Sequence, residues 1–341
     1  MPLQAPSHMN GKDETHKPAA SKRKKSKELE DLSEEDRRIK EELDLLVEVV
    51  KGNDKELMST ALTTLFKEVS TATSSVTSVP KPLKLLRPHY DSLVQVYETV
   101  LPSDSKRVFA DVLSILSTTY SKDDSRRMLR YRLEGTPNGF TLCGHEYTKN
   151  LSGEIAAEFA TRSGENKPTE DLLSLVEEII PFYMKHNAEC EAVDLLCEVD
   201  EIERIVEYVD ETSFNRVVLY IQSMSNYADS DDDKSRMLKV AYTILMKHKR
   251  YPDALRVAMK QKDVTFAEAI VKACDDPLIL KQLALMCSRQ RMAIDFSIDE
   301  ELVKIAAGEL VSSQFQYLAK ELDVLEPKLP EDVFKTHLEE R

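Results

Sequence analysis

The chain has 341 residues, enough for two ordinary domains or for one extended helical array. It carries 47 Lys and Arg against 61 Asp and Glu, a net charge of −14. A body this acidic disfavours general binding to nucleic acid or to an anionic membrane surface. Only 8 glycines are present, which argues against phosphate-cradling loops and against folds rich in tight hairpins.

The cysteines and the apolar runs bear on the compartment. Five cysteines are an odd number and include no Cys-x-x-Cys pair, so we expect reduced thiols in a cytoplasmic or nuclear protein. The longest apolar runs, Val217–Ile221 and Leu283–Cys287, are far shorter than the roughly 20 residues that cross a bilayer. The N-terminus also lacks the apolar core of a signal peptide. The sequence therefore predicts a soluble chain, without membrane or nucleic-acid partners.

Residues 1–32 are polar and predict a disordered tail, because they cannot bury enough apolar surface to offset the entropy of ordering. This tail contains the basic run Ser21–Lys27, of sequence SKRKKSK. Such a run is typical of a nuclear-import signal. A solvated tail that keeps the chain soluble explains it equally well, so both interpretations stay open.

The helical pattern begins at Ser33, which precedes three acidic residues in the manner of a capping box. One apolar stripe then follows, formed by Ile39, Leu43, Leu46, Val47 and Val50. We expect Gly52 to close this helix in the left-handed conformation. A second stripe, formed by Met58, Ala61, Leu62, Leu65, Phe66 and Val69, predicts the partner helix of an αα-hairpin.

Similar helical stripes recur to the C-terminus, and no alternating strand pattern of useful length is present. The stripes are Val108, Phe109, Val112 and Leu116; Tyr147, Leu151, Ile155 and Phe159; Leu172, Val176, Ile179 and Tyr183; Phe214, Val217, Ile221 and Met224; Leu238, Ala241, Leu245 and His248; and Leu302, Ile305, Leu318 and Leu322. This periodicity of apolar residues predicts an all-α fold.

Three polar segments and one proline divide the helices. Residues 70–78, followed by three prolines, predict an extended connector, because a proline biases the preceding residue away from helix. Residues 162–169 and 228–233 predict polar loops, and Pro181 predicts a kink or restart. The segment 33–341 is thus expected to form one helical scaffold domain, with possible sub-boundaries near 70–82 and 162–169.

Helices that are amphipathic and joined in pairs suit a superhelical stack in which neighbours share a core. The sequence has no strict period, so we expect an irregular α-solenoid of the armadillo or HEAT kind. A compact multi-helix bundle is the alternative.

A metal site was tested on the spacing of His186, Cys190 and Cys197, which could share one helix face. Three turns of helix span about 16 Å, so these three residues cannot surround one ion. Only His186 and Cys190 are close enough to chelate together, and no further ligand pair follows. We therefore predict that these thiols pack in the core.

No catalytic motif is present. His145 and Glu146 resemble the start of a zincin motif, but Lys149 stands where its second histidine is required. The acidic run Asp229–Asp233 lacks the glycine and glutamate of a calcium loop, although Ser230 within it is a weak candidate for phosphorylation. The sequence predicts a non-enzyme with no catalytic, cofactor or metal residues, and it assigns no partner-binding residues.

Several phrases resemble a known family. They are Leu32–Glu48, Ser78–Tyr90, Gly144–Tyr147, the Pro181 neighbourhood with His186–Leu196, Arg250–Met259 and Leu325–Glu339. In this order they resemble the N-terminal region of the largest scaffold subunits of the proteasome's 19S regulatory particle, the non-ATPase regulatory subunit 2 family. The resemblance covers about residues 30–341.

The resemblance implies a non-catalytic scaffold in the base of that particle, attached to the coiled coils of the AAA ATPases and to other regulatory-particle subunits. In the family, ubiquitin, shuttle receptors and a deubiquitinase bind a central toroid of Gly/Ala-rich proteasome/cyclosome repeats. The sequence ends at Arg341, before that toroid, so we expect those partners to be reached only through it. An α-solenoid adaptor in nuclear transport is the alternative function.

Overall fold

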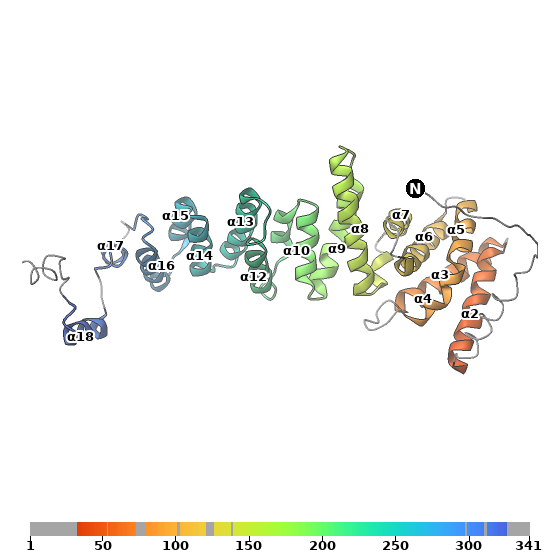
Figure 1. Ribbon diagram of the computed structural model, residues 1–341, viewed down its shortest axis with the longest axis horizontal. Coiled ribbons are helices and arrows are strands. Elements are labelled where there is room, and N and C mark those ends of the chain that lie inside the picture. The colour runs from red at the N-terminus through yellow and green to blue at the C-terminus, as the bar shows by residue number, and fades with distance from the viewer. Residues whose placement is uncertain are drawn as a thin grey trace, which may run out of the picture. The chain divides into compact units, whose positions relative to one another are not determined.

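The computed structural model describes residues 33–52, 54–72, 80–100, 103–120, 126–137, 139–296, 299–309 and 312–325. Every regular element in these ranges is an α-helix or a 3₁₀-helix, which confirms the all-α prediction (Figure 1). The predicted tail, residues 1–32, lies outside them. The chain divides into two compact units between Glu158 and Phe159. The sub-boundaries expected near 70–82 and 162–169 stay predictions.

The first unit is built around one helix with a fully buried half. Its elements are α2 (Glu34–Lys51), α3 (Lys55–Ala72), α4 (Lys81–Leu86), η1 (Arg87–His89), α5 (Tyr90–Thr99), α6 (Asp104–Ser117), η2 (Thr118–Tyr120), α7 (Arg127–Glu134), η3 (Gly139–Leu142) and the start of α8 (His145–Gly164). Helix α6 contacts α3, α5 and α7. All its residues from Phe109 to Ser117 are buried, so the core of this unit forms around them.

The predicted hairpin is formed by α2 and α3, which pack against each other. The side chain of Ser33 caps α2 by accepting a hydrogen bond of 3.2 Å from the Asp36 backbone N–H, as the acidic first turn predicted. Leu43, Val47 and Val50 are buried, as predicted. The expectation for Gly52 is wrong: its φ is −70°, and the chain leaves α2 in an extended conformation.

The extended connector predicted for residues 70–78 is wrong at its start. Helix α3 continues to Ala72, and residues 73–79 lie outside the described residues. Pro82 lies in the first turn of α4, and Pro88 lies within η1. A proline is tolerated at the start of a helix because the first N–H groups have no helical acceptor. These prolines therefore begin short helices here.

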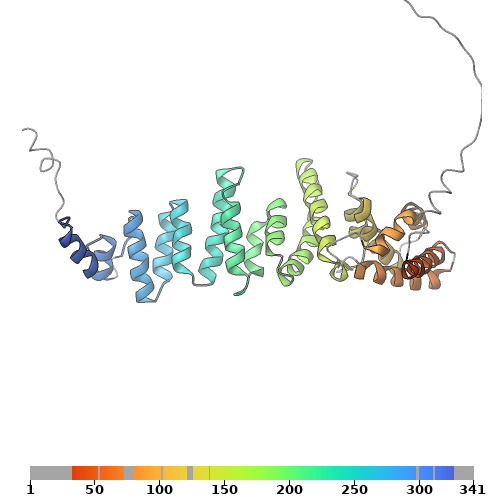
Figure 2. The ribbon, with the colours of Figure 1, turned by 60° about the horizontal axis from the view of Figure 1, so that its bottom comes forward.

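The second unit is a succession of helices that pack mainly on their neighbours along the chain. After the end of α8 they are α9 (Glu170–Lys185), α10 (Glu189–Glu198), η4 (Ile202–Arg204), α11 (Ile205–Tyr208), α12 (Phe214–Met224), α13 (Asp231–Lys247), α14 (Tyr251–Gln261), α15 (Val264–Ala273), α16 (Pro277–Gln290), α17 (Glu300–Ala306) and α18 (Ser313–Glu321). From α9 to α16 the contacts run in chain order, which Figures 1 and 2 show from two sides. This order confirms the solenoid-type prediction for this unit.

The predicted stripes of α9, α12 and α13 form the core of this unit. The buried members are Leu172, Val176, Ile179, Tyr183, Phe214, Val217, Ile221, Leu238, Ala241 and Leu245. In α14 the buried residues Ala254, Leu255, Val257 and Ala258 continue the pattern. Each helix thus buries one side against its neighbours.

Long polar side chains tie successive helices together at their ends. Lys247 of α13 donates to the carbonyl of Val206 in α11 at 2.7 Å. Lys260 of α14 donates to the Asn226 side chain, directly after α12, at 2.9 Å. The Tyr251 hydroxyl donates to the carbonyl of Ala273 at the end of α15, also at 2.9 Å. Carbonyl groups in the last turn of a helix lack helical donors, and Lys247 and Tyr251 supply such donors from a different helix.

Three boundaries in this unit differ from the sequence expectation. Helix α8 continues through Arg162 to Gly164, and α13 begins at Asp231, inside the predicted loop 228–233. Asp231, Asp232 and Asp233 instead occupy the first turn of α13, where the helix dipole favours negative charge. Helix α9 runs through Pro181 without a restart, because Ile179, Ile180, Phe182 and Tyr183 around it are all buried.

The last predicted stripe is wrong in its second half. Leu302 is buried on α17, but Leu318 and Leu322 are 55% and 62% exposed. Phe315 and Tyr317 of α18 are exposed as well. The helical spacing was therefore correct, but no described element covers this face of α18.

One exposed carboxylate predicts how stability depends on pH. Asp210 accepts hydrogen bonds from the side chains and backbone N–H groups of Ser213 and Thr212, which hold its pKa below the ordinary value of 3.8. A lowered carboxylate pKa stabilises the fold above the unfolded-state value and loses that contribution as pH falls below it. We expect wild type to lose more stability than Asp210→Ala between about pH 5 and pH 2.5, as measured by urea unfolding. Equal losses in the two proteins would contradict this assignment.

Candidate functional site

The residues tested for metal binding do not form a site. Helix α9 ends at Lys185 and α10 begins at Glu189, so His186 is not on the helix that carries Cys190 and Cys197. The His186 ring nitrogen Nδ1 lies 2.7 Å from the Phe182 carbonyl. Among the described residues, no group of three or more His, Cys, Asp or Glu side chains is placed to hold a metal ion.

The core packing predicted for the two cysteines is wrong for Cys190, which is exposed; Cys197 is half-buried. Burial raises the pKa of Cys197 to about 12, of Cys143 to about 12 and of Cys287 to about 11. A thiol is nucleophilic only as the thiolate. At neutral pH these three cysteines are therefore protonated.

The described helices also show no membrane segment, since none of them combines the length and the apolar composition needed to cross a bilayer.

The most ordered polar cluster joins α6 to the end of α7. Arg132 Nη1 lies 2.8 Å from Asp111 Oδ1, and both side chains are only 4% exposed. Asp111 also accepts a bond of 3.0 Å from the Thr136 backbone N–H and one from the Thr136 hydroxyl. Burial raises the pKa of Asp111, while these hydrogen bonds and the Arg132 charge oppose that rise. Both carboxylate oxygens of Asp111 are thus bonded to groups of the same unit.

Two of the chain's few glycines make room for this cluster. A Cβ at Gly135 would overlap the Asp111 carboxylate, and one at Gly139 would crowd both Asp111 and Arg132. The sequence analysis missed the cluster. Two features of the sequence could have indicated it. Asp111 interrupts the apolar stripe of α6, and Gly135 and Gly139 follow a segment rich in arginine.

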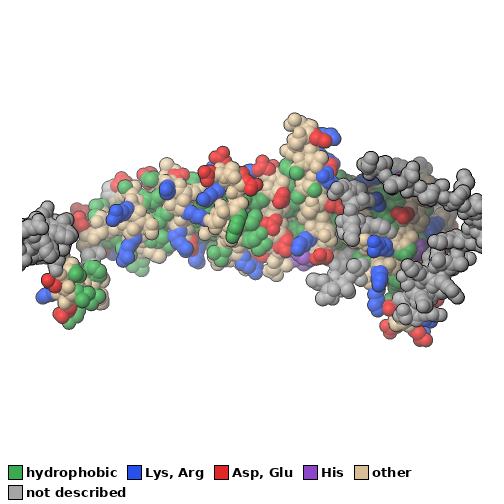
Figure 3. All heavy atoms as spheres, viewed as in Figure 1, with side chains coloured by type: hydrophobic (Ala, Val, Ile, Leu, Met, Phe, Trp, Pro, Cys, Tyr) green, Lys and Arg blue, Asp and Glu red, His purple; other side chains and the backbone are tan. Residues whose placement is uncertain are grey.

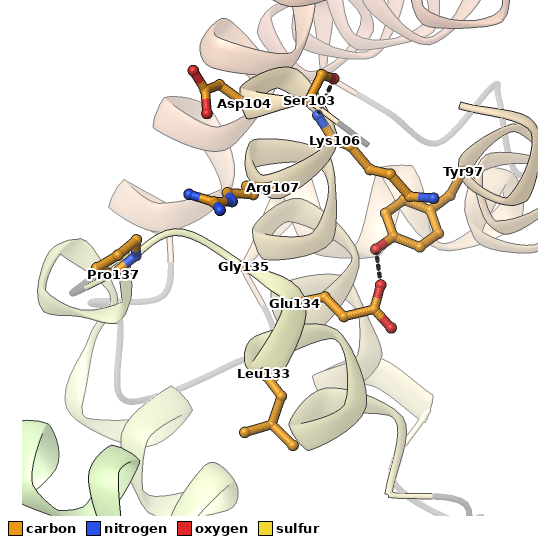
Figure 4. Close-up of a pocket in the computed structure, with 9 residues that line it drawn as sticks. All are labelled: Tyr97, Ser103, Asp104, Lys106, Arg107, Leu133, Glu134, Gly135 and Pro137. Atoms are coloured by element: carbon orange, nitrogen blue, oxygen red, sulfur yellow. Dashed lines mark hydrogen bonds between the residues drawn. The ribbon is translucent and has the colours of Figure 1, made fainter. Parts of the chain in front are cut away.

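A surface groove of about 650 Å³ lies beside this cluster (Figure 4). The Tyr97 hydroxyl donates to Glu134 at 2.5 Å, and burial raises the pKa of Tyr97. Lys106 Nζ donates to the Val100 carbonyl at 2.9 Å and lies 4.7 Å from the centre of the Tyr97 ring. Tyr97, Glu134 and Lys106 are thus already engaged in interactions within this unit.

Residues 43–339 match the family model described as the RPN1 N-terminal domain. The chain belongs to this family. The family resemblance inferred from sequence phrases is thereby confirmed.

Curated relatives in the RPN1 N-terminal domain family agree. The chain is 44% identical over 311 residues to the 26S proteasome regulatory subunit rpn1 of Schizosaccharomyces pombe, covering 91% of this chain and 35% of that one. It is 43% identical over 311 residues to the 26S proteasome non-ATPase regulatory subunit 2 of Dictyostelium discoideum, again covering 91% and 35%. The chain is also 41% identical over 315 residues to the 26S proteasome non-ATPase regulatory subunit 2 homolog A of Arabidopsis thaliana, covering 89% of this chain and 35% of that one. The chain spans about a third of the length of these relatives.

The buried ion pair of this RPN1 N-terminal domain predicts a large effect of one substitution. Arg132→Met removes the positive charge and leaves the Asp111 carboxylate buried without it, so we expect the free energy of unfolding to fall by about 3–5 kcal/mol. Asp111→Asn combined with Arg132→Met removes both charges and is expected to recover part of that loss. Urea unfolding measures both. A loss below about 1 kcal/mol for Arg132→Met would contradict this role.

Thiol reactivity tests the burial of the five cysteines. Of the five, Cys190 is the exposed one, so we expect one fast-reacting thiol per native chain with Ellman's reagent. Its rate should rise with pH, because partial desolvation and the carboxylates of Glu191 and Asp194 raise the pKa of the Cys190 thiol above its usual value. All five should react in urea. Cys190→Ala should abolish the fast phase, and a fast phase that survives this substitution would refute the assignment.

Proposed function

We propose that this chain is a non-catalytic scaffold part of a subunit in the base of the proteasome regulatory particle. The family match over residues 43–339 carries the proposal. Relatives named as 26S proteasome regulatory subunits support it, with identities of 41–44%. In this role the chain serves ubiquitin-dependent protein degradation by holding other proteins in place, and no bond is made or broken on it.

The helical succession of the second unit suits such a role, because it offers a long surface whose parts keep their spacing. Ion pairs link neighbouring helices there. Arg216 of α12 binds Glu189 of α10, whose carboxylate is buried. Arg204 binds Glu177 of α9, and Lys281 of α16 lies 2.8 Å from Glu301 of α17. Both of these pairs are exposed, and exposed pairs contribute only about 0.2–1 kcal/mol each. Their part is to fix the orientation of each helix rather than to stabilise the fold.

The partners we propose are the coiled coils of the AAA ATPases and other subunits of the regulatory particle. An acidic chain suits coiled coils with basic residues at exposed positions, since complementary charge speeds association and sets register. Ubiquitin, shuttle receptors and the deubiquitinase are proposed to bind outside these 341 residues. We propose cytoplasmic and nuclear localisation, as for the assembly. The alternative, an α-solenoid adaptor in nuclear transport, was motivated by the helical array, the acidic body and the basic run at residues 21–27. That run lies outside the described residues, so the alternative stays a prediction.

Purification of the chain from cells tests this function. Tagged at its C-terminus and expressed in its source cells, the chain should co-purify the base ATPases in buffer that contains ATP. Crosslinking mass spectrometry of the eluate should give crosslinks from lysines of residues 43–339 to regulatory-particle subunits. A tagged chain with Arg132→Met, which weakens the fold, should recover less of them. Recovery without any proteasome subunit would reject the proposal.

A further inference from the structure

A groove of about 400 Å³ lies in the second unit, where the ends of α10 and α12 meet the start of α13. Its apolar lining includes Ile202, which is buried, and the half-buried side chains of Met224 and Met237. Figure 3 shows apolar and acidic side chains next to one another over α12 and α13. Methionine side chains are flexible and polarisable, so they adapt to apolar groups of different shape.

An exposed aromatic residue stands at the edge of this groove. Tyr227 is 83% exposed, the most exposed of the large apolar side chains in the described residues. Its backbone N–H donates to the Met224 carbonyl at 2.8 Å, and the side chain of the preceding residue, Asn226, accepts from Lys260 at 2.9 Å. The backbone of the turn that carries Tyr227 is therefore already ordered in the free chain. This lowers the entropy cost of binding a partner through Tyr227.

The charges that line the groove are mainly negative. Four carboxylates line it, those of Glu198, Asp200, Asp229 and Asp233, together with one guanidinium, that of Arg236. Arg236 is occupied by its own chain: it binds Asp200 and donates to both oxygens of Glu203, at 2.5 and 2.8 Å. Among the described residues, neither Glu198 nor Asp229 takes part in an ion pair.

We propose that this groove binds a segment of a partner protein that carries one apolar side chain flanked by Lys or Arg residues. The apolar side chain lies against Met224, Met237 and Ile202, and the flanking cations lie near Glu198 and Asp229. Tyr227 adds a ring face, on which a Lys or Arg side chain stacks favourably. An acidic peptide or a nucleic-acid phosphate is repelled by the same carboxylates.

This binding goes beyond the proposed scaffold role and does not depend on it, because the groove lies within one unit and its binding is measurable without any proteasome subunit. The test uses the full 341-residue chain and a fluorescein-labelled peptide with one Leu between Lys and Arg residues. Fluorescence anisotropy should show saturable binding. Changing the Leu to Ser, or the Lys and Arg residues to Glu, should each weaken it.

A pair of matched variants separates the groove from the net charge of the chain. Glu198→Lys with Asp229→Lys should weaken binding on the order of tenfold, since it turns two favourable exposed charge contacts into repulsions. Glu211→Lys with Asp275→Lys makes the same change in net charge at exposed positions outside the groove lining, and should leave binding within about twofold. Tyr227→Ser should weaken binding of the Leu peptide while leaving thermal unfolding unchanged.

Two results would overturn the proposal. One is the absence of saturable binding of the Leu peptide to the wild-type chain. The other is equal weakening by the two double variants, which would assign the interaction to net charge alone. Circular dichroism of each variant confirms that the helices are retained, so that a loss of binding reports on the groove itself.

Discussion

Most of the described helices have one apolar side, and none can bury that side alone. Helix α2 depends on α3 to cover Leu43, Val47 and Val50, and α13 depends on α12 and α14 to cover Leu238, Ala241 and Leu245. The fold is therefore a sequence of neighbours, each of which completes the core of the one before. The opposite sides stay in water, which explains how a chain with 32% charged residues still forms a core in each unit.

Charged side chains form ion pairs in two different environments, the buried core and the exposed surface. Asp111 and Arg132 are buried in the first unit, where an unpaired charge costs several kcal/mol, and two glycines keep the space around them. In the second unit the ion pairs of Arg204 with Glu177 and of Lys281 with Glu301 are exposed and contribute little each. The buried pair makes the local fold depend on single residues. The exposed pairs instead adjust the spacing of neighbouring helices.

The same arrangement decides which groups stay exposed and which are engaged within the fold. Burial keeps the thiols of Cys143, Cys197 and Cys287 protonated, and the groups around Tyr97 bind one another. What remains exposed are grooves between helix ends, of which the one beside Tyr227 combines an apolar lining with an acidic edge. Such grooves arise wherever helices of unequal length are stacked, so a scaffold can acquire binding sites without changing its core.

The sequence by itself determined the helical class, the Ser33 cap, most of the buried stripes and the family, because periodicity, capping and long unrepeated phrases are local properties of the chain. Contacts between distant segments decided the rest. They place Pro82 at a helix start, leave Leu318 exposed despite its helical spacing, pair Asp111 with Arg132, and bring Glu198 beside Asp229. Helical spacing shows which residues share a face, but only packing shows what that face meets, because several neighbours satisfy the same apolar pattern.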